Sequence, residues 1–214
     1  MNEEKNVFSV NKKSVNLLIV IATAVAFLVM QLWEKSQTQG TFYGHTTEFL
    51  LRHGALYAPA VRNGEWYRLI THMFLHGDIT HLGHNMLILF FLGNVLERYL
   101  GKIRYIIAYF FSGILAAMGS VVYNTTDTVS IGASGAVFGV VGAMLWIFIR
   151  NKGKLKEFTK EQLLIFLFLS VFAGFGDYGV DNAAHIAGLI AGFLLGILLY
   201  WKREEETSAC DGQI

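Results

Sequence analysis

The sequence GASGAVFGVVGAMLWIFI, at residues 132–149, is a continuous run of apolar residues without a charged side chain. Its length is close to the roughly 20 residues that an α-helix needs to cross a hydrocarbon core about 30 Å thick. A serine, Ser134, nevertheless stands near its start. Because polar groups inside a membrane span are costly and usually functional, the run predicts a transmembrane helix with a site at its first turn.

Further apolar runs of similar length lie on both sides of this segment. Together they predict six transmembrane helices, over residues 14–33, 81–96, 103–123, 132–149, 158–175 and 182–201. The composition agrees, because 54% of the 214 residues are hydrophobic and 15% are charged, whereas charged residues make up about a quarter of a soluble domain. We therefore predict an all-α membrane protein, a six-transmembrane-helix bundle over residues 14–201 with polar tails at 1–13 and 202–214.

The connections between these runs differ in their basic residues. Lysine and arginine precede the first run, follow the second, fourth and sixth, and are absent from YNTTDTVS (123–130) and GFGDYGVDN (174–182). The positive-inside rule therefore predicts that both termini and both tails are cytoplasmic. Without a transit-peptide pattern, the plasma membrane is the expected location. A formal net charge of +1 argues against a nucleic-acid partner.

The connection between the first two runs, residues 34–80, is long and rich in aromatic residues and histidines. We expect it to be partly helical and packed on the outer side of the bundle. His45 and His53 are interpreted as solvated loop residues, and His72 and His76 as hydrogen-bonding residues that fix the loop. Helical spacing of histidines in this region also suits zinc, but no H-E-x-x-H pattern accompanies it, so we expect no metal.

Polar residues open three of the six predicted helices, which all run from outside to inside. Their first turns therefore lie at one depth, which brings Ser134 together with His185, His81 and Asn85. A serine and a histidine are the residue types of nucleophilic catalysis, in which imidazole takes the hydroxyl proton. His81 and Asn85 are one helical turn apart and, with the Ser134 amide, have the donors to stabilise an oxyanion.

Neighbouring residues have their own predicted roles. Glycines at every fourth position, Gly135 and Gly139 in one helix and Gly188, Gly192 and Gly196 in another, favour close helix packing in a membrane. Phe138 lies on the face of Ser134 and can support the imidazole ring. Asp181 is interpreted as an N-cap residue or as a third catalytic member, and the glycine-rich segment 174–182 as a mobile cap over the site.

The combined pattern resembles the rhomboid intramembrane serine proteases. The matching motifs are W-Y-R (66–68), H-L-G-H-N-M (81–86), G-A-S-G-A-V-F-G (132–139) and A-H-I-A-G-L-I-A-G (184–192). The resemblance implies a Ser134–His185 dyad without an acidic third member, and an oxyanion site formed by His81, Asn85 and the Ser134 amide. It further implies supporting roles for Gly132, Phe138, Gly188 and Gly192, and structural roles for Trp66 and Arg68. Many family members carry tyrosine at the position of Phe138.

These features predict a hydrolase, a serine endopeptidase that cleaves transmembrane protein substrates near the outer membrane boundary. No cofactor is expected, and the sequence does not indicate an oligomeric state. One alternative is a catalytically inactive rhomboid-like factor that binds membrane proteins, but such a factor is expected to lack the serine or the histidine. The other is a small multi-pass transporter, which would place charged or broken-helix sites near the midplane.

Overall fold

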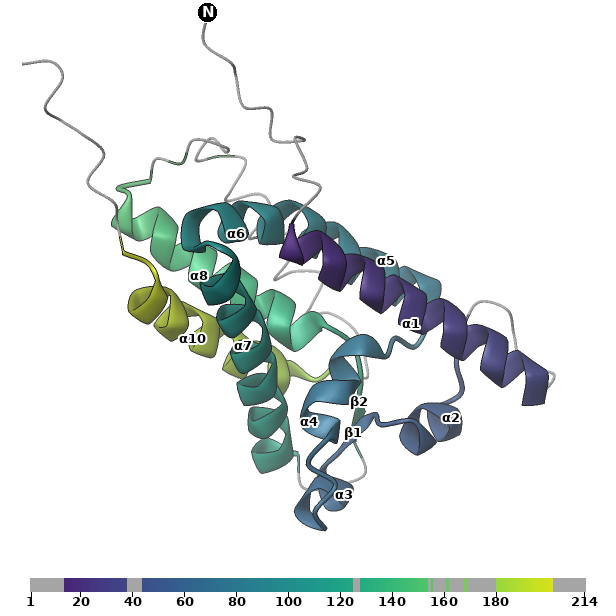
Figure 1. The fold of residues 1–214 in the computed structure, drawn as a ribbon. Helices are drawn as coiled ribbons and strands as arrows, with labels where there is room; N and C mark the ends of the chain where they lie inside the picture. Colours follow the sequence, from purple (N-terminus) through teal and green to yellow (C-terminus); the bar gives the residue numbers. More distant parts are fainter. Residues whose placement is uncertain are drawn as a thin grey trace, which may run out of the picture.

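The structure, a computed structural model, describes residues 14–37, 44–124, 128–153, 155, 161, 168 and 180–201. Its longer helices form one bundle, and shorter elements gather at one end (Figure 1). The bundle consists of α1 (Val15–Gln37), α7 (Lys102–Tyr123), α8 (Ser134–Arg150), α10 (Asn182–Leu199) and one further long helical segment. That segment comprises α5 (Ile79–Ile88), the π-helical turn η2 (Leu89–Gly93) and α6 (Asn94–Leu100).

Within the described residues, four helical segments are long and apolar enough to cross a membrane. They are Val15–Ser36, Ile79–Leu100, Lys102–Tyr123 and Asn182–Leu199. Each confirms a predicted helix, and the second is extended at both ends because α5, η2 and α6 continue into one another. The predicted span at 158–175 lies outside the described residues, except for positions 161 and 168. The presence of six transmembrane helices therefore stays a prediction.

The fourth predicted span, residues 132–149, corresponds to a helix with nearly the same bounds. Helix α8 has 17 residues and begins at Ser134. At a rise of about 1.5 Å per residue, it falls short of a hydrocarbon core about 30 Å thick. Most of its side chains are nevertheless buried, because α7 and α10 pack against it. Helix α8 is thus the centre of the bundle and is shielded from lipid by its neighbours.

Small residues let α8 and α10 touch backbone to backbone. A Cβ atom on Gly188 would lie 2.2 Å from the carbonyl oxygen of Gly135, and one on Gly142 would lie 2.1 Å from that of Leu189. Such distances leave room only for hydrogen, which is the physical basis of small-residue packing in membranes. The predicted glycine interface is confirmed, and it fixes α10 against the start of α8.

We call the described part of the connection between α1 and α5, residues 44–78, the outer loop after its predicted side of the membrane. It contains α2 (Thr47–Arg52), the strand β1 (Leu56–Tyr57), α3 (Ala58–Arg62), α4 (Arg68–Thr71) and the 3-10 turn η1 (His72–Phe74). Strand β1 pairs antiparallel with β2 (Val129–Ser130), with Leu56 opposite Ser130 and Tyr57 opposite Val129. The predicted partly helical loop is thus confirmed. Because β2 leads directly into α8, the pairing ties the loop to the segment that carries Ser134.

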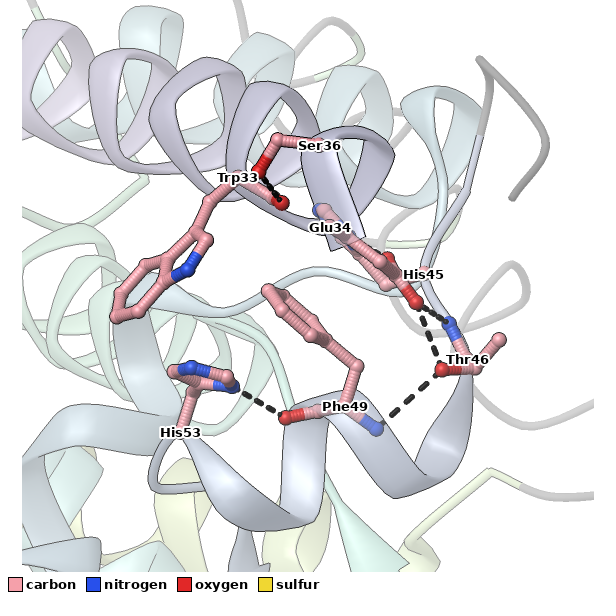
Figure 2. Close-up of polar contacts among 7 residues, drawn as sticks. All are labelled: Trp33, Glu34, Ser36, His45, Thr46, Phe49 and His53. Carbon is pink, nitrogen blue, oxygen red and sulfur yellow. Dashed lines mark hydrogen bonds and ion pairs between the residues drawn. The ribbon is translucent and has the colours of Figure 1, made fainter. Parts of the chain in front are cut away.

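A buried carboxylate at the end of α1 anchors the other side of this loop (Figure 2). Glu34 accepts hydrogen bonds from the Thr46 amide at 3.0 Å and the Thr46 hydroxyl at 2.7 Å, and its other oxygen lies 2.6 Å from His45 Nδ1. The side chains of His45 and Glu34 are only 1% and 2% exposed. The interpretation of His45 as a solvated loop residue is therefore wrong, because a buried carboxylate requires such donors.

Candidate active site

Ser134 and His185, 51 residues apart in sequence, are in contact. The Ser134 Oγ atom lies 2.9 Å from His185 Nε2, which is a normal hydrogen-bond distance. Ser134 is the first residue of α8, and His185 lies in the first turn of α10 and is buried. The ring of Phe138 stacks on the imidazole at a centroid distance of 4.3 Å and an interplanar angle of 11°. Ser134 and Phe138 of one predicted helix and His185 of another are thus brought together.

The turn before Ser134 depends on a glycine. Gly132 has a φ of +105°, a conformation that L-residues with a side chain rarely adopt. A Cβ atom there would lie 2.8 Å from the imidazole of His81 and 3.6 Å from Asn85 Nδ2. The Gly132 amide donates to the carbonyl oxygen of His72 at 2.9 Å, which fixes the turn. Both the backbone conformation and the available space therefore exclude a larger residue.

His81 and Asn85 lie beside this turn because α5 begins there. Asp78 caps the helix by accepting hydrogen bonds from the amides of Thr80 and His81. Asn85 is buried, and its Nδ2 atom donates to the His81 carbonyl oxygen at 3.2 Å, which leaves its second N–H for another acceptor. The Ser134 amide belongs to the first turn of α8, where backbone donors have no partner within the helix. The imidazole of His81, the side-chain amide of Asn85 and the backbone amide of Ser134 therefore surround the turn at Gly132.

Two further histidines hold the outer loop against the same turn. His76 Nε2 accepts a long hydrogen bond of 3.4 Å from the Ala133 amide, and its ring lies 5.0 Å from that of His81. His72 Nδ1 lies 2.8 Å from the Arg68 carbonyl oxygen. Burial lowers the pKa of His76 to about 3 and that of His72 to about 4, so both are neutral at physiological pH. Their predicted role in fixing the loop is borne out by these contacts, but their link to the turn is not evident from the sequence.

Arg68 and Trp66 differ in their surroundings. The Arg68 guanidinium is buried, donates to the carbonyl oxygens of Leu51 and Ala55 at 2.8 and 2.7 Å, and pairs with Glu65. It therefore closes the outer loop between α2 and α4. Trp66 is 70% exposed, so most of its surface makes no contact with other described residues. Its location on the outer loop suits an anchor at the membrane–water interface, where tryptophan is enriched.

The remaining site predictions have different outcomes. Asp181 caps α10 by accepting a hydrogen bond from the Ala184 amide at 3.0 Å, so its N-cap role is confirmed. The predicted cap over the site spans residues 174–182, and of these only Val180, Asp181 and Asn182 are described. The cap therefore stays a prediction.

Comparisons with known proteins identify sequence relatives of this chain. A family model described as the rhomboid domain matches residues 63–202. YdcA of Bacillus subtilis is 37% identical over 148 residues, which cover 69% of this chain and 74% of YdcA. Rhomboid protease GluP of Bacillus subtilis is 31% identical over 92% of this chain but only 37% of GluP. RHOMBOID-like protein 5 of Arabidopsis thaliana is 42% identical over 73% of this chain and 51% of that protein.

Proposed function

The chain belongs to the rhomboid family, and on that premise we propose that it is a serine endopeptidase that cleaves transmembrane proteins within the membrane. Relatives named as rhomboid proteases support this proposal. The observation that carries it is the 2.9 Å contact between Ser134 Oγ and His185 Nε2. This contact is the geometry that a nucleophile and its general base require.

In this mechanism, the neutral imidazole of His185 removes the hydroxyl proton as Ser134 Oγ attacks a substrate carbonyl carbon. The imidazolium then returns the proton to the leaving amine, and a serine ester of the substrate remains. Water, activated by the same imidazole, hydrolyses this ester and restores the hydroxyl. Phe138, stacked on the ring, keeps the imidazole plane fixed during both proton transfers.

The oxyanion that forms in each step needs donors placed in advance. The Ser134 amide, the imidazole of His81 and the free N–H of Asn85 supply them around the Gly132 turn. Removing one such donor typically lowers kcat by about 10²–10³ in enzymes that use them. Gly132 therefore contributes by allowing His81 and Asn85 to approach, and Gly188 and Gly192 contribute by keeping α10 close to α8.

The substrates follow from the depth of the site. Ser134, His185 and His81 all belong to first turns of helices, so the dyad lies near one membrane surface. The positive-inside rule, applied to the short connections and the tails, makes that surface the outer one and both termini cytoplasmic. A transmembrane segment must unwind locally before its carbonyl groups become accessible. We expect cleavage near the outer boundary of the plasma membrane, at small or helix-breaking residues.

Cleavage of a transmembrane reporter by the full chain in proteoliposomes tests the proposal. Ser134→Ala and His185→Ala should abolish product formation, whereas Ser36→Ala and His53→Ala, matched changes away from the dyad, should leave it intact. Cleavage that persists in Ser134→Ala would overturn the proposal. A wild-type protein that binds the reporter without cleaving it would instead be the inactive binding factor.

A further inference from the structure

Asp181 carries more hydrogen bonds than a helix cap requires. The Ala184 amide donates to its Oδ1 atom at 3.0 Å, and Asn124 Nδ2 donates to the same oxygen at 3.2 Å. The hydroxyls of Ser120 and Ser130 both donate to Oδ2. A carboxylate offers about four acceptor positions, so these donors fill them.

These donors come from separate parts of the fold. Ser120 lies in the last turn of α7, Asn124 is the C-cap residue of α7, and Ser130 lies in β2. Asn124 also donates to the Ser120 hydroxyl at 3.1 Å. The carboxylate therefore joins the end of α7, the strand β2 and the start of α10. We call the set of Asp181, Ser120, Asn124 and Ser130 the carboxylate clasp.

The clasp lies just before both residues of the dyad in the chain. Ser130 precedes Ser134 by four residues, and Asp181 precedes His185 by four residues. The segments that deliver the hydroxyl and the imidazole are thus fastened to the same carboxylate. Burial alone would raise the pKa of Asp181, but hydrogen bonds from the clasp and the Ala184 amide lower it below its usual 3.8. The clasp therefore holds an ionised carboxylate at neutral pH.

We propose that Asp181 is a positioning residue that sets the separation of Ser134 and His185 through the carboxylate clasp. It does not act as the acidic member of a triad, because the clasp and the Ala184 amide occupy its acceptor positions. The inference rests on the proposed protease function. Without the clasp, the start of α10 is free to shift relative to β2, and a misplacement near 1 Å can lower an enzymatic rate by about a hundredfold.

The test compares clasp variants in the full chain. Asp181→Ala removes the carboxylate, Ser130→Ala removes one donor, and the double variant removes both. Asp181→Asn is the conservative variant, because its amide oxygen can accept from Ala184 and its NH₂ group can donate to the serine hydroxyl oxygens. Glu48→Gln is the matched control, because it removes a carboxylate that is 75% exposed and paired only with Arg52 on the outer loop.

The readouts are kcat and KM for a transmembrane reporter, and the rate constant for labelling by a fluorophosphonate probe. Asp181→Ala should lower kcat and the labelling rate by about tenfold to a hundredfold, with KM changed by less than about twofold. Ser130→Ala should have a smaller effect, and the double variant should match Asp181→Ala because both act through one clasp. Asp181→Asn should recover most of the rate.

Two results would overturn the inference. One is that Asp181→Ala and Ser130→Ala have the same kcat and the same labelling rate as wild type. The other is a raised KM with an unchanged labelling rate, which would assign Asp181 to substrate docking. If Asp181→Ala does not fold, Ser130→Ala still decides between these outcomes. Two other results would contradict the protease function itself: no labelling of the wild-type protein, and reporter cleavage that persists in Ser134→Ala. Neither result involves a clasp variant, so a failure of the protease function is distinguishable from a failure of the clasp.

Discussion

Gly192 of α10 faces Gly139 of α8 so closely that a Cβ atom on Gly192 would lie 1.9 Å from the Gly139 carbonyl oxygen. The same hypothetical atom would lie 2.5 Å from the Gly139 Cα atom. Because these neighbours are backbone atoms, no change of rotamer can make room. The two helices that supply the dyad are therefore held at a distance that only glycine permits.

Gly192→Ala should force α8 and α10 apart and separate Ser134 from His185. Overpacking of this kind usually costs about 1–3 kcal/mol of stability, and we expect a loss of labelling rate of about a hundredfold. Gly83→Ala in α5 is the matched control, because nothing lies within 4 Å of the added methyl group. Thermal unfolding and fluorophosphonate labelling measure the two effects. Full labelling of Gly192→Ala would contradict the role of the glycine contact.

His81→Ala and Asn85→Ala should each lower kcat by about 10²–10³ while KM changes little, because an oxyanion donor acts in the transition state. His84→Ala is the control, since His84 is an exposed neighbour on the same helix. Steady-state cleavage of a transmembrane reporter separates kcat from KM. A raised KM with an unchanged kcat would show that His81 and Asn85 bind substrate but do not stabilise the oxyanion.

Phe138→Ala should slow labelling of Ser134 by about tenfold, because a stacked aromatic pair contributes about 0.5–1.5 kcal/mol beyond its buried area. Phe138→Tyr keeps the ring and should label within about threefold of wild type. The comparison must be made on folded protein, since the ring is also buried in the bundle. Equal labelling of the alanine variant would remove any need for ring support.

Stability should fall as the pH drops below about 6.5, because burial holds the pKa of His76 near 3. The unfolded chain takes up a proton on this side chain below its usual pKa of 6.5, whereas the folded protein does not. His76→Gln removes the titration and keeps an acceptor for the Ala133 amide. Between pH 5 and 6, the unfolding free energy of wild type should fall more steeply with decreasing pH than that of His76→Gln. The difference in slope should be about 1.4 kcal/mol per pH unit. Parallel plots of unfolding free energy against pH for wild type and His76→Gln would contradict this account.

Much of the fold is predictable because hydropathy reports membrane burial directly. The runs that became α1, α7 and α10 have nearly their expected bounds, and helices entering from one side bring Ser134 and His185 to one depth. The burial of α8 among other helices was not predictable, because an apolar sequence can reflect contact with neighbouring helices as well as contact with lipid. The π-helical turn η2 lies in the apolar sequence LFFLG and leaves no signal.

The polar contacts outside the dyad were harder to predict. Glu34 and His45 are 11 residues apart in sequence, and only the structure reveals that both side chains are buried. Asp181 is identifiable as a cap, but its other donors, such as Ser120 and Ser130, are ordinary polar residues in the sequence. Their proximity depends on tertiary packing of α7 and β2. Residue type and helical spacing therefore predicted the contact between Ser134 and His185, whereas the polar network around Asp181 required the structure.

The most direct test of the central claim is the site of covalent modification. Wild-type protein in detergent is treated with a fluorophosphonate, and the adduct is located by peptide mass spectrometry. The account predicts a single adduct on Ser134, formed at a rate that His185→Ala reduces to near background. An adduct on another serine, or an unchanged rate in His185→Ala, would contradict the proposal that these two residues form a catalytic dyad.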